Sequence, residues 1–210
     1  MVMSTVESLL PHDLLWGLPA SALPVNAPAW VFEVVGLGHP VVVRRARVAA
    51  GLVAVGVRGR SRDQRYATHM KLDEVQRRVR PEALNAMTPD ADWPALRALQ
   101  QVRPLMEALG LPWGVAGSAG FELASGVPVL HAGSDLDLIL RTPNFIDRQH
   151  AARLVEQLAG AVCRIDLQLQ TPLGAVALRE WAGPSRQVLL KTEDGARLVD
   201  NPWLVQVCAA

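Results

Sequence analysis

Residues 113–118 read Trp-Gly-Val-Ala-Gly-Ser, and residues 134–140 read Ser-Asp-Leu-Asp-Leu-Ile-Leu. The first segment is a short apolar run that ends in a Gly-Ser turn, and the second is an aliphatic strand that carries two carboxylates. Because successive side chains of a strand point to opposite faces, Asp135 and Asp137 should share one face, roughly 7 Å apart. Two neighbouring anions repel each other, so we expect a cation between them. Carboxylate oxygens suit Mg²⁺, and one or two magnesium ions are predicted here.

A helix and a second strand follow this pair of carboxylates. Residues 144–158 carry apolar side chains at helical spacing, and residues 161–170 alternate between apolar and polar residues, with Asp166 on the polar side. A strand, a helix and a strand form a right-handed crossover whose two strands can pair in parallel. We therefore expect Asp166 to stand beside Asp135 and Asp137.

The segments that flank this unit are also patterned. A helix is predicted from about residue 92, as its cap, to residue 109, where Gly110 ends it. Two more strands are predicted at residues 174–181 and 186–191. The middle of the interval between Ser118 and Asp135, residues 127–130, predicts either an added strand or a hairpin.

The N-terminal half differs in composition from the C-terminal half. Residues 30–36, 40–48 and 52–57 are Val-rich and separated by Gly or Pro, which predicts a small antiparallel unit. Residues 71–80 have apolar residues at helical spacing and predict a helix. Residues 81–92 contain two prolines and three acids and predict a connection between two halves. We place the domains at residues 1–85 and 86–210.

Size and composition limit the class of protein. With 210 residues, half of them hydrophobic, the chain is globular and long enough for one domain or two small ones. No run of 18 apolar residues is present, and no basic and then apolar leader opens the sequence, so neither a membrane span nor a signal peptide is expected. Cys163 and Cys208 are too few for a disulfide framework or a zinc cluster. A reducing cytoplasm fits best.

The net charge of +1 hides a strong asymmetry. Residues 44–80 hold eleven Lys and Arg against three acids, whereas the rest of the chain holds ten against seventeen. Within this segment, residues 56–65 read Gly-Val-Arg-Gly-Arg-Ser-Arg-Asp-Gln-Arg. Glycines let backbone N–H groups approach a ligand, and guanidinium groups match phosphate oxygens. Arg58, Arg60 and Arg62 are therefore candidate phosphate-binding residues.

Two other interpretations of the arginine-rich loop remain open. It can be a solubilising surface loop. For an arbitrary loop of this composition, that interpretation has the same weight as anion binding. It can also bind nucleic acid, but a single-strand platform needs aromatic rings between the basic residues, and Tyr66 is the only ring nearby. Nucleic acid is therefore the less favoured partner.

Three carboxylates on neighbouring strands, preceded by a Gly-Ser turn, suit in-line attack at a phosphorus. Metal ions held by Asp135, Asp137 and Asp166 would clamp the attacking and leaving oxygens. Backbone amides of Gly117 and Ser118, with the Ser118 hydroxyl, would bind the outgoing phosphate oxygens. Asp166 can also accept the proton of an attacking hydroxyl. We add Ser134, which directly precedes the Asp-Leu-Asp segment, to the candidate substrate-binding residues.

Gly117-Ser118, Asp135-Leu136-Asp137 and Asp166 resemble the signature of the polymerase-β type of nucleotidyltransferase. A closer resemblance extends over almost the whole chain. Residues 11–16 (Pro-His-Asp-Leu-Leu-Trp), the arginine-rich loop, residues 113–124 and residues 134–138 are similar to the malonate decarboxylase holo-acyl carrier protein synthase family. Its members are phosphoribosyl-dephospho-CoA transferases.

The resemblance implies a specific reaction. A serine of the malonate decarboxylase acyl carrier protein subunit would attack the α-phosphorus of 2'-(5''-triphosphoribosyl)-3'-dephospho-CoA, and diphosphate would leave. The two catalytic aspartates of the family map onto Asp135 and Asp137, while Asp166 carries over from the wider superfamily only. The fold that the resemblance implies is α+β, with a small β-rich N-terminal domain and a nucleotidyltransferase-like C-terminal domain that has a mixed sheet.

Two rival functions follow from the same residues. Another metal-dependent nucleotidyltransferase, acting on a protein or a small molecule, would use the same carboxylates. A nucleic-acid-binding module would use the arginine-rich segment and would leave the carboxylates a structural role. Its affinity would fall steeply with salt.

Overall fold

The computed structural model describes residues 8–61, 63–87 and 91–204. The chain divides into two compact units, Met1–Val79 and Arg80–Ala210. We placed the boundary between residues 85 and 86, within a predicted connection. The structure instead gives the 3-10 helix η3 (Pro81–Leu84) to the second unit. The reason is packing: a side chain at Gly114 would meet the backbone of Pro81, so η3 lies directly on the strand that contains Gly114.

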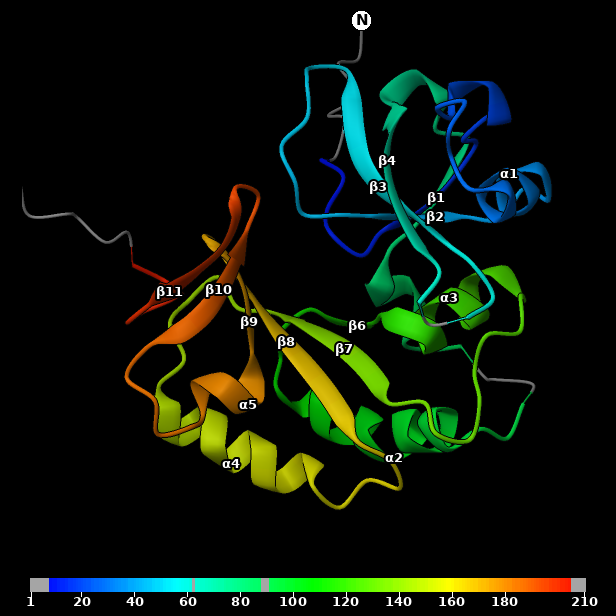
Figure 1. Cartoon of the computed structure of the whole chain (residues 1–210). Helices are drawn as coiled ribbons and strands as arrows, with labels where there is room; N and C mark the ends of the chain where they lie inside the picture. The colour runs from blue at the N-terminus through cyan, green and yellow to red at the C-terminus, as the bar shows by residue number, and fades with distance from the viewer. Residues whose placement is uncertain (1–7, 62, 88–90, 205–210) are drawn as a thin grey trace, which may run out of the picture. The chain divides into compact units, whose positions relative to one another are not determined.

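The first unit is built on a five-stranded antiparallel sheet in the order β4-β3-β2-β1-β5. Its strands are β1 (Leu14–Trp16), β2 (Val41–Val43), β3 (Leu52–Arg58), β4 (Arg65–Lys71) and β5 (Arg77–Val79). Helix α1 (Ala29–Gly36) and the short 3-10 helices η1 (Ala20–Ala22) and η2 (Leu72–Glu74) complete it. Figure 1 shows this unit in blue and cyan.

Helix α1 corrects one prediction, because residues 30–36 are helical and not a strand. Val31, Val34 and Val35 recur at helical spacing and are buried in one cluster with the sheet residues Val53, Val55 and Val57, among others. Valine favours strands by intrinsic propensity, but the apolar stripe that it forms here covers the sheet. Burial of that stripe outweighs the propensity.

The predicted helix over residues 71–80 is also wrong. This segment forms η2 and then β5, which pairs with β1 through Leu14 and Val79. Arg78 of β5 donates to the fully buried carboxylate of Asp13 at 2.6 Å. A buried carboxylate is stable only with a partner, so this ion pair favours strand pairing in place of the local helical pattern.

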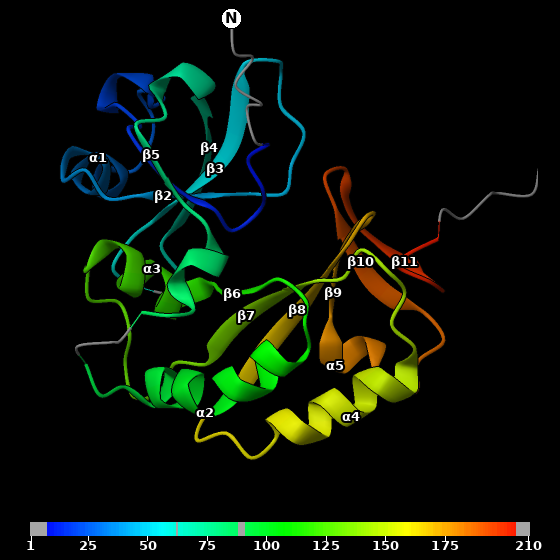
Figure 2. The same ribbon diagram turned by 180° about the vertical axis from the view of Figure 1, so that it is seen from behind.

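The second unit contains a six-stranded mixed sheet in the order β11-β10-β9-β8-β7-β6. The strands are β6 (Trp113–Val115), β7 (Leu136–Arg141), β8 (Ile165–Thr171), β9 (Gly174–Ala177), β10 (Val188–Thr192) and β11 (Gly195–Val199). Its helices are α2 (Pro94–Ala108), α3 (Gly117–Ser125), α4 (Arg148–Leu158) and α5 (Leu178–Trp181). In Figures 1 and 2, α2 and α4 run along the same face of this sheet.

The crossover predicted from the sequence is confirmed. β7 and β8 are parallel neighbours joined through α4, whereas the other neighbouring strands of this sheet pair antiparallel in the residues that the structure describes. One face of the two strands is aliphatic and buried, with Leu136, Leu138 and Leu140 on β7 and Ile165, Leu167 and Leu169 on β8. The architecture is therefore α+β with one antiparallel and one mixed sheet. Residues 174–181, predicted as a single strand, end as the short helix α5.

Helix α4 begins at Arg148 and not at residue 144, because Asp147 caps it. The Asp147 carboxylate accepts the backbone N–H of His150 at 2.7 Å. This hydrogen bond lowers the pKa of Asp147, and burial acts weakly in the opposite direction. Capping satisfies one of the first backbone donors of the helix, which have no partner within the helix itself.

We predict that Asp147→Ala lowers the thermal midpoint of unfolding, while Asp147→Asn, which keeps a capping oxygen, stays close to the wild type at neutral pH. Since the pKa of Asp147 is lower in the folded state, the stability that its charge contributes is present above the unfolded pKa and is lost as the pH falls through the folded value. The stability advantage of the wild type over Asp147→Ala should therefore shrink as the pH falls below about 4, because the capping carboxylate loses its charge. Thermal melts from pH 7 to pH 3 measure it; a difference that grows in acid would contradict this assignment.

No helix in the described residues is long and apolar enough to cross a bilayer.

Candidate active site

Asp137 and Asp166 are direct partners in the parallel pairing of β7 with β8. Side chains of paired residues on neighbouring strands point to the same face, and the strands lie about 4.8 Å apart. Both carboxylates are partly exposed, and they lie on the face opposite the buried leucines of the two strands. Two acids that are distant in the sequence therefore meet at the start of two adjacent strands.

Gly117 lies against the Asp137 carboxylate. A methyl group at Gly117 would overlap Oδ2 and Cγ of Asp137, and it would lie 2.7 Å from its Cβ. Gly117 also has φ +58°, which an L-residue adopts only with strain. The backbone N–H of Ala116 donates to the Asp137 carbonyl at 2.9 Å, so the turn after β6 folds tightly over β7. Glycine is required here for both shape and conformation.

Gly117 and Ser118 open helix α3, which begins directly at this turn. The helix has no side-chain N-cap, since Ala116 precedes it. The first backbone N–H groups of a helix and its dipole together favour an anion at this end. The structure thus places the predicted Gly-Ser pair at the N-terminus of α3, next to Asp137.

Asp135 lies just outside β7, which begins at Leu136. Its side chain is partly exposed. Burial raises the pKa of the Cys163 thiol, a backbone hydrogen bond from Leu136 lowers it, and the negative charge of Asp135 raises it further. Asp135 therefore lies near the connection from α4 to β8, in which Cys163 is found.

The interval between α3 and β7 contains neither the strand nor the hairpin that we predicted. It is an irregular loop, residues 126–135, in which five backbone N–H groups donate to nearby side chains. Ser134 is buried, and its hydroxyl accepts the backbone N–H of His131 at 3.1 Å. The predicted substrate-binding residue Ser134 therefore closes a turn directly before Asp135.

The carboxylate pair fits a magnesium ion by its chemistry. Mg²⁺ is commonly held by one or two carboxylates, with substrate phosphates and water completing its shell. In the residues that the structure describes, no group of three or more His, Cys, Asp and Glu side chains is arranged to hold a metal ion. A magnesium site would therefore depend on Asp137 and Asp166, with Asp135 close along the chain, and on substrate phosphates and water for its remaining ligands.

The arginine-rich loop joins β3 to β4 in the first unit. Gln64 organises it: its Oε1 accepts the backbone N–H groups of Arg60 at 2.9 Å and Ser61 at 3.3 Å. A side chain at Gly59 would overlap Gln64, which explains the glycine. These two amides are therefore used within the loop. Neither periodicity nor composition indicated this role of Gln64.

The three predicted arginines are placed differently. Arg58 is the last residue of β3 and is partly buried, whereas Arg60 is exposed in the loop. Arg62 lies outside the described residues.

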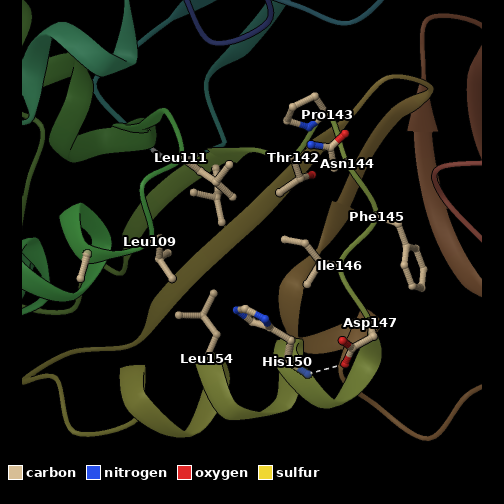
Figure 3. A pocket seen from close by; sticks show the side chains of 12 residues that line it. Leu109, Leu111, Thr142, Pro143, Asn144, Phe145, Ile146, Asp147, His150 and Leu154 are labelled. Atoms are coloured by element: carbon tan, nitrogen blue, oxygen red, sulfur yellow. Dashed lines mark hydrogen bonds between the residues drawn. The ribbon is translucent and has the colours of Figure 1, made fainter.

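The second unit also has a cavity of about 370 Å³, lined by Leu109, Leu140, Ile146, Leu154, Asn144 and His150, among others. Figure 3 shows and labels Leu109, Asn144, Ile146, His150 and Leu154 around it. Leu140 lies at the far end of β7 and on the opposite face from Asp137. This cavity is therefore separate from the carboxylate pair.

Comparison with known proteins assigns both units. Residues 79–202 match the family model of the phosphoribosyl-dephospho-CoA transferase MdcG C-terminal domain, and residues 10–81 match that of its N-terminal domain. This chain belongs to the phosphoribosyl-dephospho-CoA transferase family. The resemblance inferred from the sequence motifs is confirmed, and with it the prediction of a transferase enzyme.

Relatives in this transferase family align over nearly the whole chain. A phosphoribosyl-dephospho-CoA transferase of Pseudomonas syringae pv. tomato is 62% identical over 204 residues, covering 96% of this chain and 97% of that protein. The Pseudomonas fluorescens Pf-5 protein of the same name is 57% identical over 208 residues, covering 99% and 100%. That of Azotobacter vinelandii is 51% identical over 198 residues, covering 92% and 93%. No solved structure matches the chain.

Proposed function

We propose that this protein transfers the 2'-(5''-phosphoribosyl)-3'-dephospho-CoA group from its triphosphate precursor to a serine of an acyl carrier protein, that of malonate decarboxylase. The observation that carries the proposal is the register pairing of Asp137 with Asp166 beside the N-terminus of α3. The names of the relatives support a substrate derived from dephospho-CoA. We further propose that the second unit has a polymerase-β-type nucleotidyltransferase fold and that the enzyme acts in the cytoplasm.

The residues of the site have distinct tasks in this reaction. The N-terminus of α3, with Gly117 and Ser118, binds phosphate oxygens of the triphosphate. Asp166 accepts the proton of the carrier serine as its oxygen bonds to the α-phosphorus and the bond to diphosphate breaks. Asp137 and Asp166, together with Asp135, would hold Mg²⁺. When bound, the ion would neutralise charge on the phosphates and on the leaving diphosphate.

We predict that reversing the charge of Arg58 and Arg60 together, to Glu, raises the KM for the triphosphate at least about tenfold. Each charge-assisted hydrogen bond to a phosphate contributes about 1.5–3 kcal/mol, and the reversed charge adds repulsion. Steady-state kinetics at fixed ionic strength measure this. Reversing Arg97, an exposed arginine of α2 paired with Asp92, serves as the control. If the kinetics of the double variant are unchanged, the loop is only a solubilising surface.

Mass spectrometry of the carrier subunit tests the reaction itself. After incubation with enzyme, Mg²⁺ and the triphosphate precursor, the carrier should gain the mass of the phosphoribosyl-dephospho-CoA group on one serine, with release of diphosphate. Parallel incubations with ATP or GTP test the rival nucleotidyltransferase function. Carrier modified by a nucleotide in place of the CoA derivative would refute the proposal, as would salt-sensitive binding to nucleic acid without any transfer.

A further inference from the structure

Glu122 lies in α3, the helix whose first residue contacts the Asp137 carboxylate. It is half-buried, and its Oε2 accepts two backbone N–H groups, from Val129 at 2.7 Å and from Leu130 at 2.8 Å. Hydrogen bonds to an ionised acceptor are roughly twice as strong as neutral ones. Because residues 126–135 contain no helix or strand, this carboxylate anchors an otherwise irregular segment to α3.

Helix α3 is itself fixed to β6, so it can act as an anchor. Helix α3 starts one residue after β6, because the backbone N–H of Gly120 donates at 2.9 Å to the carbonyl of its N-cap residue Ala116 and forms the first turn. A side chain at Gly120 would lie 2.6 Å from the Val115 carbonyl oxygen, which shows how closely the helix approaches the end of the strand. The position of Glu122 therefore follows from that of β6, the strand paired with β7.

The anchored segment leads straight into the candidate active site. Leu130 is buried, and the turn closed by His131 and Ser134 follows it at once. Asp135 comes next, and then the Leu136 N–H donates to the Arg164 carbonyl at 2.9 Å as β7 begins. Asp135 thus stands between two fixed points, Leu130 on one side and β7 on the other. If Leu130 were released from Glu122, the Asp135 carboxylate could move.

We propose that Glu122 is a positioning residue for Asp135. Through the N–H groups of Val129 and Leu130 it holds the loop on α3 and so keeps Asp135 in place beside Asp137. The inference rests on the proposed function, because it assigns Asp135 to the metal and phosphate chemistry of that site. Glu122 itself reaches neither substrate nor metal in this role.

The test compares Glu122→Ala with Glu122→Gln, which keeps an accepting oxygen, and with Glu180→Ala as a matched control. The Glu180 carboxylate also holds a backbone group, the Leu189 N–H at 2.6 Å, but it lies on α5. Three quantities are measured for each full-length variant: hydrogen exchange of residues 127–135, Mn²⁺ binding by electron paramagnetic resonance, and kcat for diphosphate release.

Glu122→Ala should exchange faster over residues 127–135, bind Mn²⁺ about 10–100-fold more weakly and lose kcat by a similar factor. Glu122→Gln should recover most of each effect, whereas Glu180→Ala should exchange faster only around Leu189. The inference would be overturned if residues 127–135 of Glu122→Ala exchanged hydrogen at the same rate as in the wild type. It would also be overturned if they exchanged faster while the Mn²⁺ affinity and kcat stayed at their wild-type values. If the wild-type protein binds Mn²⁺ but releases no diphosphate, the proposed function is refuted and the inference on Glu122 is not. Hydrogen exchange and Mn²⁺ affinity would then still decide the role of Glu122. A wild-type protein that binds no Mn²⁺ would overturn both.

Discussion

Asp137→Asn should reduce transfer to the carrier protein by at least about 10²–10³-fold, the scale observed when one electrostatic contact to a transition state is lost. The substitution keeps the shape of the side chain but removes a charge that faces Asp166 across the parallel strand pair. Because it also relieves repulsion between two neighbouring carboxylates, the variant should unfold at the same temperature as the wild type or at a higher one. Diphosphate release and a thermal melt, made on the same preparation, measure the two quantities.

The control for this prediction is Asp147→Asn, the same chemical change at a capping position in the same unit. It should leave transfer unchanged, since Asp147 only caps α4. If Asp137→Asn stays active, or if it loses activity only because it unfolds, then the carboxylate pair has a structural role. The rival in which the carboxylates are structural and the arginines bind nucleic acid predicts instead a salt-sensitive nucleic-acid affinity that does not change in Asp135→Asn.

Gly117→Ala should reduce activity by about 10²-fold, as expected when catalytic groups are displaced by about 1 Å. The added methyl group would overlap the Asp137 carboxylate and approach its Cβ to 2.7 Å. The Cβ is fixed by the strand, so either Asp137 or the start of α3 has to shift. The left-handed conformation at φ +58° adds about 1–2 kcal/mol of strain. Diphosphate release and chemical denaturation measure these effects.

Gly126→Ala distinguishes the two effects of a substitution at Gly117, which are backbone strain at positive φ and steric overlap with Asp137. Gly126 ends α3 at φ +70°, and a side chain there would meet no atom within 4 Å. This variant should lose about 1–2 kcal/mol of stability from the conformation alone and keep its activity. Equal losses of activity in the two glycine variants would show that backbone strain, and not contact with Asp137, explains the effect of Gly117→Ala.

The two largest errors of prediction have the same physical origin. The Val-rich residues 30–36 form α1, and the amphipathic residues 71–80 form η2 and β5. In each case the local pattern fits more than one structure, and a long-range contact decides: burial against the sheet in the first, and the ion pair of Arg78 with buried Asp13 in the second. Propensity is a weak guide wherever tertiary packing contributes more.

Within the candidate site, the side chains that would bind ligand were visible in the sequence, but those that hold them were not. Asp137, Asp166 and the Gly-Ser turn form a recognisable pattern because the chemistry of phosphate and Mg²⁺ restricts the residues that can serve it. Gln64 and Glu122 each organise a loop through two backbone N–H groups. A single polar residue that bonds to nearby backbone leaves no periodic or compositional signal.

The sequence by itself determined the strand, helix and strand that bring Asp166 into phase with Asp137, since alternation and helical spacing fix which side chains share a face. It also determined the family, because the motifs extend along nearly the whole chain. Only the tertiary structure decided where the two units divide, that Asp135 falls just outside β7, and that the loop between α3 and β7 is tied to Glu122. These features depend on hydrogen bonds and contacts between residues that the fold brings together. The local sequence pattern does not show which residues will meet.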